Sequence, residues 1–258
     1  MKEPRLRAAN RYRAEIANGE GIVASQRLRY RVFAEELGAD LPDSRAGLDR
    51  DRYDPYCHHL LVRDLASGDI VACTRLLTDE AAHGAGGFYS QNEFEMDRVL
   101  TRPGRFVEVG RTCVDPHYRN GAVIATLWQG IGQIVNARKV DFLFGCASVS
   151  LAPDPVYAGA VLQRLLSRHR AEADTQVAPL RSLPEMSALS AGIVPRMPPL
   201  LRAYVSLGAK ACGEPCWDPA FNVADVFMLL DLREIDSRYG RHFLSAESSP
   251  EIRERALA

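Results

Sequence analysis

Two oppositely charged side chains stand within one apolar segment of the chain, residues 106–114 (FVEVGRTCV). Burying an ionised group costs free energy unless the group has a partner or a task. Glu108 could take the proton from an attacking ammonium, directly or through water, and Arg111 could orient a carboxylate or another polar group of a substrate. The structural alternative is that Glu108 and Arg111 simply pair with each other.

The relation between these two side chains depends on the shape of the strand that carries them. Side chains alternate along a regular strand, so residues 108 and 111 would face opposite sides of the sheet. Gly110 lies between them, and a glycine inside a strand is a frequent position for a β-bulge. We therefore predict a bulge at Gly110, both charges on one face, and a slot where this strand splays from its parallel neighbour near residues 142–149.

A second candidate site follows the same strand. Residues 118–121 (YRNG) occupy the predicted turn into a helix, and the first N–H groups of a helix can bind an anionic or polar group. The polar arm of a thioester cofactor would suit this position. An ordinary connecting turn is the alternative.

The elements that position these residues have a strand, helix, strand order. Residues 122–138 place apolar side chains on one helical face, and residues 140–149 form a continuous apolar run, typical of a strand buried on both faces. Two strands joined by a helix in this way form a right-handed crossover with parallel strands. The segment therefore predicts the core of an α/β sheet.

The rest of the chain predicts further elements around this core. We expect a strand hairpin at 58–64 and 70–77, helices at 155–168 and 200–207, and a last strand at 222–232. The remaining expectations are two helical stretches within 7–37 broken near residues 18–19, a loop at 40–55, a mobile connection at 78–104, an irregular stretch at 170–199 and a polar tail over about 240–258. Together they predict one α/β domain over 1–258, built on a twisted mixed sheet with flanking helices.

Composition excludes several classes of protein. Of 258 residues, 47% are hydrophobic and 25% charged, with a net charge of -1, as in an ordinary globular protein with no global attraction to nucleic acid. No run approaches the roughly 20 apolar residues of a membrane span, and the first residues lack the apolar core of a secretory signal. We expect a cytoplasmic protein.

Basic residues concentrate near the start of the chain, within about residues 1–20 and on the following helical stretch. They are Lys2, Arg5, Arg7, Arg11, Arg13, Arg27, Arg29 and Arg31. Such a cluster is either a solvated face or a landing patch for an acidic carrier protein or for anionic lipid headgroups.

Cysteine and histidine positions argue against metal chemistry. The six cysteines are scattered, and Cys212 and Cys216 have no second pair nearby, so neither disulfides nor a zinc site is predicted. No histidine is placed by sequence to activate Cys113 as a nucleophile, and attack by an amine needs no covalent enzyme intermediate. His58 and His59 are interpreted as a structural pair.

Four motifs together resemble those of a known group of enzymes. LRYRVF at 28–33, LDRDRYD at 48–54, TRLL at 74–77 and EVGR at 108–111 are similar in type and order to the acyl-homoserine lactone synthases. These are acyltransferases of the GNAT-like (acyl-CoA N-acyltransferase) fold that use acyl carrier protein. Longer segments, at 30–39, 108–116 and 212–225, resemble the ornithine Nα-acyltransferases that begin ornithine-lipid synthesis, and this resemblance spans about residues 25–245.

The resemblance implies an amide-forming acyltransferase. Its donor would be a 3-hydroxyacyl group on the phosphopantetheine of acyl carrier protein, with acyl-CoA as the alternative, its acceptor the α-amine of ornithine, and its product a lyso-ornithine lipid. No tightly bound cofactor or metal is implied. A lipid product must enter a membrane, so peripheral contact with the inner membrane face is also expected.

The resemblance also carries residue roles. Glu108 and Arg111 would be catalytic. Residues that bind substrate would be Arg29, Phe33, Asp51, Asp54 and Arg75. Apart from the resemblance, we expect the acyl donor to contact the strand at 106–114 and the turn after it, at Val109, Cys113, Val114, Tyr118, Arg119, Asn120 and Gly121.

Alternatives to these roles exist. Asp51 and Asp54 could merely shape a turn, or could hold the second ammonium of ornithine, and Arg75 could be an exposed arginine with a buried stem. Ala39 stands where the lactone synthases usually have Trp, which disfavours a lactone-forming enzyme. The turn at 118–121 keeps only Arg119 and Gly121 of the glycine-rich signature of coenzyme-A-dependent relatives, which favours a carrier protein.

Two rival functions remain. One is the same chemistry with another acceptor, such as glycine, lysine or tyrosine. The other is a catalytically idle GNAT-like protein that acts at membranes or on a partner.

Overall fold

The computed structural model describes residues 11–41, 44–184, 195–235 and 250–257. The chain forms two compact units. Unit 1 comprises residues 1–77, 110–139 and 237–258, and unit 2 comprises residues 78–109 and 140–236. Strand β5 (Phe106–Val114) begins in unit 2 and ends in unit 1. The single-domain organisation of the chain stays a prediction.

Unit 1 is built on a meander of strands in the order β1, β2, β3 and the second half of β5. β1 (Tyr12–Ile16) and β3 (Ile70–Thr78) both run antiparallel to β2 (His58–Asp64), which confirms the predicted hairpin. The predicted helix over residues 12–16 is wrong. Five residues are too few for a reliable periodic signal, and pairing with β2, reinforced by the ion pairs Arg11–Asp64 and Arg63–Glu15, makes this segment a strand.

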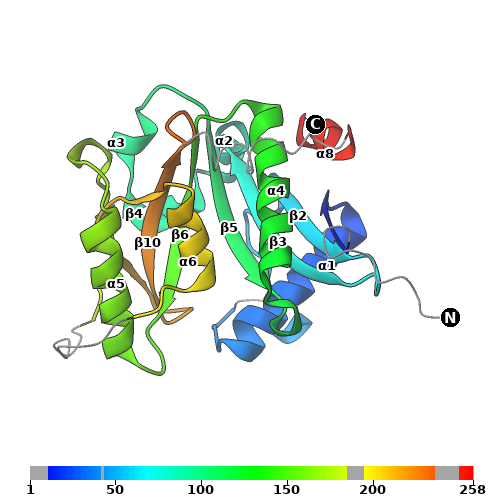
Figure 1. The fold of residues 1–258 in the computed structure, drawn as a ribbon, viewed down its shortest axis with the longest axis horizontal. Coiled ribbons are helices and arrows are strands. Elements are labelled where there is room, and N and C mark those ends of the chain that lie inside the picture. The colour runs from blue at the N-terminus through cyan, green and yellow to red at the C-terminus, as the bar shows by residue number, and fades with distance from the viewer. Residues whose placement is uncertain (1–10, 42–43, 185–194, 236–249, 258) are drawn as a thin grey trace. The chain divides into compact units, whose positions relative to one another are not determined.

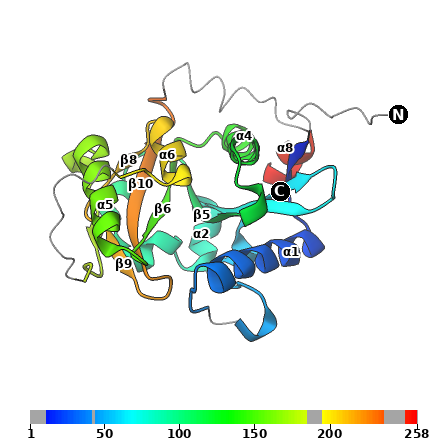
Figure 2. The same cartoon turned by 60° about the horizontal axis from the view of Figure 1, so that its bottom comes forward.

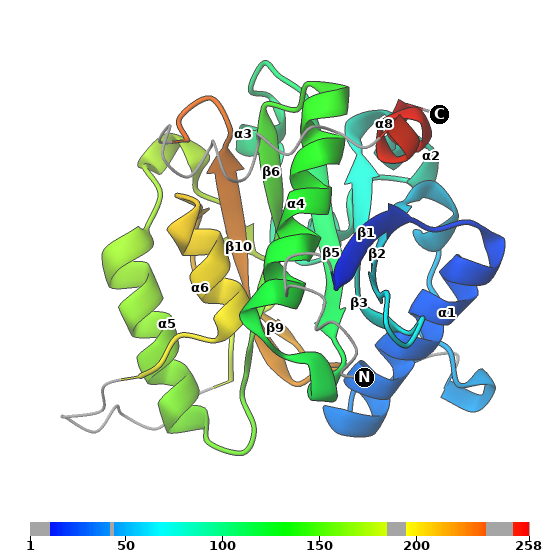
Figure 3. The ribbon, with the colours of Figure 1, turned by 45° about the vertical axis from the view of Figure 1, so that its right-hand side comes forward.

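Helices cover both faces of these strands. α1 (Gly19–Tyr30) continues as a π-helix (Arg31–Glu36), and short 3-10 turns follow at Ser44–Ala46 and Asp54–Tyr56. After the turn Pro116–Tyr118, α4 (Gly121–Arg138) packs on β1 and β2 together with α8 (Pro250–Leu257). Figure 2 shows α4 and α8 on one side of the strands and α1 on the other, and Figure 3 shows α8 beside α4.

The last described segment adds a helix that the prediction of a polar tail did not include. Residues 250–257 form helix α8, in which Ile252 and Ala256 are buried, and Arg255 donates a hydrogen bond to the backbone oxygen of Ile16. Two apolar residues four positions apart were too weak a pattern to predict this helix. Residues 236–249 lie outside the described part of the chain.

Unit 2 contains the rest of the mixed sheet. The first half of β5 pairs in parallel with β6 (Phe142–Ser150), and β10 (Val223–Asp231) pairs antiparallel with β6 along its whole length (Figure 1). The short strands β8 (Lys210–Ala211) and β9 (Cys216–Asp218) pair with β10, and β4 (Phe94–Glu95) pairs separately with β7 (Ala178–Pro179). The predicted strand, helix, strand order at 106–149 is confirmed.

The helices of unit 2 include two that were not predicted. α5 (Pro155–His169) and α6 (Pro199–Ser206) match the expectation, and a 3-10 turn lies at Ala173–Thr175. The segment 78–104, predicted only as a mobile connection, contains α2 (Asp79–Ala85), a 3-10 turn (Tyr89–Asn92) and α3 (Asp97–Leu100). The Thr78 side chain caps the start of α2, and Gly86 ends it in the left-handed conformation.

Among the described helices, none has both the length and the apolar character that a bilayer crossing requires.

Candidate active site

Unit 1 holds a buried network of guanidinium and carboxylate groups centred on Arg29. This α1 side chain is 0% exposed, and its Nε donates to Asp49 Oδ2 at 2.8 Å. Nη1 and Nη2 donate to the two carboxylate oxygens of Asp54 at 2.8 and 3.0 Å, and Nη2 also donates to the Asp49 backbone oxygen. Five donors in a planar fork allow one arginine to hold two carboxylates in this way.

Arg75 and Arg111 complete the network. Arg75, on β3 and 4% exposed, binds both carboxylate oxygens of Asp51 at 2.5 and 2.9 Å and lies 3.2 Å from Asp54 Oδ1. The Arg111 guanidinium lies 3.3 Å from Asp49 Oδ2 and 3.5 Å from Asp51 Oδ2. Three guanidinium groups thus face three carboxylates, and their formal charges cancel.

Asp54 and Asp51 are held in the ionised form by this arrangement. Burial by itself would raise the pKa of Asp54, but hydrogen bonds and charge from Arg29 and Arg75 hold that pKa well below its usual range. Asp51 behaves alike, since burial opposes ionisation while Arg75 and Arg111 lower its pKa.

The network brings together the predicted residues Arg29, Asp51, Asp54, Arg75 and Arg111. Asp51 and Asp54 also shape the local turn, by accepting hydrogen bonds from the backbone of Tyr53 and Asp51. Asp49 was missed as a site residue, although it lies inside the motif at 48–54. Asp49 accepts its hydrogen bond from Arg29, which lies 20 residues earlier in a helix, and no local sequence pattern around Asp49 indicates this contact.

Two expectations are corrected here. Arg29 cannot belong to a landing patch for a partner, because it is buried within the network, and Arg75 is not an exposed arginine with only its stem buried. Of the remaining patch residues, Arg27 and Arg31 are exposed, with Arg31 3.6 Å from Asp115. Lys2, Arg5 and Arg7 lie outside the described residues.

Phe33 and Cys113 lie at the apolar core of unit 1. Cys113 is buried with Leu28, Val32 and Leu61, and Phe33 packs against this cluster. The Cys113 thiol lies 3.6 Å from Cys73 Sγ, and this contact together with burial raises its pKa well above the usual range. A protonated, buried thiol is unsuited to the nucleophilic role that the sequence already disfavoured.

Strand β5 is irregular at Arg111. The backbone φ of Arg111 is 50°, in the left-handed region that costs a non-glycine residue about 1 kcal/mol or more, whereas Gly110 lies outside that region. The Gly110 carbonyl accepts a hydrogen bond from Thr74 Oγ1. The unusual conformation therefore falls one residue after the glycine at which the bulge was predicted.

In unit 2, the ladder between β5 and β6 is short and ends within residues 142–149, the span near which the splay was predicted. Its last pair is Glu108 with Phe144. Just beyond, a Cβ on Gly145 would lie 2.2 Å from the Val109 carbonyl oxygen, so only glycine fits there. The predicted sharing of one face by Glu108 and Arg111 remains a prediction, because these residues belong to different units.

Glu108 is buried in unit 2 (4% exposed) and held by three donors. Oε2 accepts from the Tyr89 backbone at 2.7 Å, and Oε1 accepts from the Ser90 backbone at 2.7 Å and from Ser90 Oγ at 2.5 Å. These donors fix the orientation of the carboxylate. Tyr89 and Ser90 were missed, because residues 78–104 were interpreted as a connection.

More of the hydrogen-bonding groups at the turn before α4 have partners within the protein than predicted. The Asn120 side chain accepts hydrogen bonds from the backbone N–H groups of Ala122 and Val123. Two of the N–H groups that were expected to bind the acyl-thioester arm are therefore already occupied. Arg119 makes two hydrogen bonds to the Glu36 carboxylate, at 2.7 and 2.6 Å. Tyr118 and Gly121 lie at the same turn, where Gly121 begins the helix.

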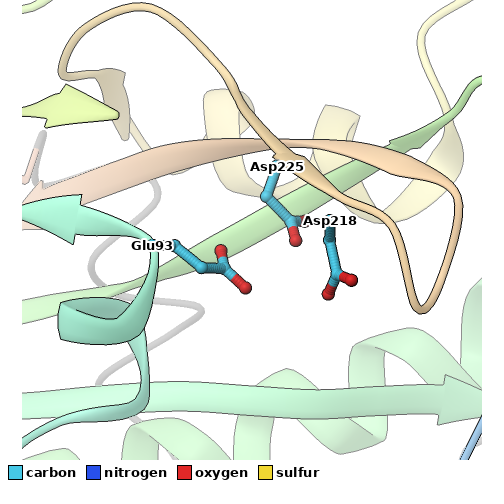
Figure 4. A group of neighbouring side chains, drawn as sticks. All are labelled: Glu93, Asp218 and Asp225. Atoms are coloured by element: carbon cyan, nitrogen blue, oxygen red, sulfur yellow. The ribbon is translucent and has the colours of Figure 1, made fainter. Parts of the chain in front are cut away.

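A further cluster of charged side chains in unit 2 was not predicted. Glu93, Asp218 and Asp225 are all buried, and each offers one carboxylate oxygen within 4.8 Å of the others (Figure 4). Such a group could hold a cation. Its members stand 125 and 7 residues apart in sequence, so no motif joins the first to the other two.

Comparison with known proteins finds a matching family model and several relatives. A family model described as an acetyltransferase (GNAT) domain matches residues 28–129. The chain is 36% identical over 240 residues to the L-ornithine N(alpha)-acyltransferase of Brucella abortus (strain 2308), covering 87% of this chain and 85% of that protein. It is 32% identical over 238 residues to the protein of the same name from Rhodobacter capsulatus, covering 86% and 90%.

Solved structures share the fold. FeeM, an N-acyl amino acid synthase from uncultured soil microbes, matches with a TM-score of 0.52 at 14% identity over 87% of this chain and 92% of its own. The acyl-homoserine lactone synthase LasI matches with a TM-score of 0.52 at 10% identity over 91% and 95%. The predicted GNAT-like fold is thereby confirmed.

Proposed function

Because this chain belongs to the L-ornithine N(alpha)-acyltransferase family, we propose that it is an acyltransferase that moves a fatty acyl group onto the α-amine of ornithine and forms an amide. The observation that carries this proposal is the identity of 32–37% to four such enzymes, which extends over most of the chain. Similarity of that extent includes both units rather than the shared GNAT segment alone.

The proposed reaction is direct transfer. The ornithine ammonium loses a proton to Glu108, directly or through water, and the resulting amine attacks the thioester carbonyl. The new bond joins nitrogen to the carbonyl carbon, the carbon–sulfur bond breaks, and the thiolate leaves and takes up a proton. Burial of Glu108 and the three donors that orient it support this assignment.

The charge-balanced network of unit 1 supports a positioning role for Arg111. The Arg111 side chain is only 14% exposed and is oriented by Asp49 and Asp51, so its guanidinium could meet the acceptor carboxylate with little loss of conformational entropy. Arg29, Asp54 and Arg75 would hold that scaffold, with Phe33 on its apolar side.

We propose that the acyl donor is a 3-hydroxyacyl group on acyl carrier protein, which would make the product a lyso-ornithine lipid. Exposed Arg27 and Arg31 could meet an acidic carrier. Its phosphopantetheine arm would pass the turn Tyr118–Gly121 and the β5 backbone at Val109 and Val114. Peripheral contact with a membrane would accompany release of this product.

The test offers purified protein both 3-hydroxyacyl carrier protein and 3-hydroxyacyl-CoA, with a panel of ornithine, lysine, glycine and tyrosine. Mass spectrometry should detect an N-acyl product with ornithine foremost, and with the carrier-bound donor. If another amino acid is preferred, that amino acid rather than ornithine is the acceptor. Absence of any acylamino acid would favour an idle binding protein and refute the proposal.

A variant pair tests the role of Glu108. Glu108→Gln should keep the fold but slow transfer by roughly 10²-fold or more, because the amide cannot accept the proton. Glu95→Gln, an exposed carboxylate on β4 of the same unit, is the matched control and should act as the unaltered protein does. Near-normal turnover of Glu108→Gln would remove Glu108 from the reaction.

A further inference from the structure

The acidic cluster of unit 2 contains a carboxylate oxygen that the protein leaves unsatisfied. Glu93 is 2% exposed, and its Oε2 lacks a hydrogen-bond partner among the described residues. Figure 4 shows its carboxylate directed toward Asp225 and Asp218. A buried acceptor without a donor costs about 1–3 kcal/mol, and more when it is charged, so such an atom points to a missing cationic or donor group.

The charges of Glu93 and Asp218 are not balanced by the described residues around them. Glu93 and Asp218 form no ion pair within the part of the chain that the structure describes. Arg181 runs past the cluster, but its guanidinium donates to the backbone oxygens of Trp217 and Asn92. Burial, and then the charge of Asp225, raise the pKa of Glu93 to about 8, as expected of carboxylates crowded without a cation.

The remaining polar contacts orient the cluster rather than neutralise it. Asp218 Oδ1 accepts from the backbone of Ala220 and Phe221, and Asp225 Oδ1 accepts from Ser148 Oγ. Neutral donors of this kind fix each carboxylate. They bring no positive charge to either aspartate.

We infer that Glu93, Asp218 and Asp225 form the subsite for the side-chain ammonium of the acceptor amino acid, an inference that rests on the proposed function. A primary ammonium has three N–H donors, and the cluster offers three carboxylate oxygens. At charge-assisted distances of about 2.8 Å, tetrahedral donors hold their acceptors about 4.6 Å apart. The oxygens of the cluster lie within 4.8 Å of one another, so the spacing fits.

The cluster is connected to the proposed base within the same unit. Ser90 Oγ bonds Glu108 and lies 3.3 Å from Cys146 Sγ, and the Cys146 thiol in turn interacts with Glu93. A single turn, Tyr89–Asn92, therefore links the group proposed to deprotonate the α-amine with the group proposed to bind the second nitrogen. Ornithine carries its two nitrogens on a four-carbon chain, which suits two such neighbouring subsites.

The network of unit 1 is the less suitable place for that ammonium. Asp51 and Asp54 were considered for it from the sequence, but their charges are matched by Arg29, Arg75 and Arg111. A cation added there would meet three guanidinium groups. In unit 2, Glu93 and Asp218 form no ion pair with described residues, so a cation bound there offers an electrostatic gain that the network does not.

The test compares ornithine with norvaline, which has the same carbon chain without the second amine. The unaltered enzyme should favour ornithine by about 10²-fold or more in kcat/KM. Glu93→Gln and Asp225→Asn should lower that preference at least about tenfold, through a higher KM for ornithine. Glu95→Gln is the control, and circular dichroism verifies that each variant folds.

Other outcomes would overturn the inference in distinct ways. The inference fails if the unaltered enzyme uses norvaline and ornithine equally well. It also fails if both variants keep the full preference for ornithine, because the cluster then does not bind the side-chain ammonium. If a chelator removes the ornithine preference and Mg²⁺ or Mn²⁺ restores it, the occupant is a metal ion. Should no amino acid be acylated, the proposed function fails, and calorimetric binding of ornithine against norvaline to the same variants still decides the subsite.

Discussion

Glu93 should make the protein less stable as the pH rises through neutrality. Its pKa is raised from 4.5 to about 8 in the folded chain, first by burial and then by the charge of Asp225. An acid whose folded pKa exceeds its unfolded pKa binds more protons when folded, so the free energy of unfolding falls with pH between the two values. The loss begins above about pH 4.5 and is complete above about pH 8.

The magnitude follows from the size of the shift. One pKa unit corresponds to about 1.4 kcal/mol, so a shift from 4.5 to about 8 gives about 5 kcal/mol at most. Relaxation of a buried site upon ionisation reduces that figure, and we expect about 2–5 kcal/mol. Glu93→Gln removes the titrating group without changing its shape.

Urea unfolding of both proteins from about pH 5 to pH 9 measures this difference. The unfolding free energy of the unaltered protein should drop relative to that of Glu93→Gln as the pH rises, and then level off. Because the two proteins share every other titrating group, their difference isolates Glu93. Glu95→Gln, exposed two residues away, should follow the unaltered protein. Parallel curves for the unaltered protein and Glu93→Gln would refute the reasoning.

Three further substitutions probe the scaffold. Arg29→Met removes the shortest contacts of the buried Asp49 and Asp54, which keep only their longer contacts to Arg111 and Arg75, and should cost about 3–5 kcal/mol of unfolding free energy. Exposed Arg31→Met should cost under about 1 kcal/mol, and equal losses in denaturant titrations would contradict the buried network. Gly145→Ala places a Cβ against the Val109 carbonyl oxygen and should cost about 1–3 kcal/mol, and a thermal midpoint equal to that of the unaltered protein would show that the strands do not approach so closely. Asn120→Ala removes the side chain that caps α4 and should lower the unfolding free energy by about 1 kcal/mol. Asn120→Ser should recover part of this loss, because serine can also cap a helix, whereas replacement by another apolar residue in place of alanine should not.

The parts of the fold that were predictable are those with strong periodic patterns. Residues 106–149 alternate, then follow a 3.6-residue period, then become continuously apolar, and the structure has β5, α4 and β6 there. β1 was missed because its five residues become a strand through pairing with β2 rather than through their own pattern.

The candidate site was predictable where its residues fall into motifs. Arg29, Asp51, Asp54 and Arg75 lie in three short motifs, and the structure gathers them into one network. The charge balance of that network could not be read from the sequence, because it depends on distances across helix α1, strand β3 and the loop between them. Asp49 shows this, since only its position beside Arg29 distinguishes it from the other acids of the loop.

The acidic cluster was beyond sequence reasoning for another reason. Single carboxylates are common, and Glu93 lies in a segment with no resemblance motif. Asp218 and Asp225 lie within the segment at 212–225 that resembles the ornithine acyltransferases, but nothing in that segment points to a partner near residue 93. Burial and convergence are tertiary properties, and they alone identify the cluster.

The central claim is amide formation on the α-amine of ornithine, and one measurement tests it most directly. Purified protein, 3-hydroxyacyl carrier protein and ornithine labelled with ¹⁵N at the α position are combined, and the product is examined by mass spectrometry and NMR. We expect an N-acylornithine whose amide nitrogen carries the label, together with release of the carrier thiol. An unchanged donor, or an amide at the unlabelled side-chain nitrogen, would contradict the claim.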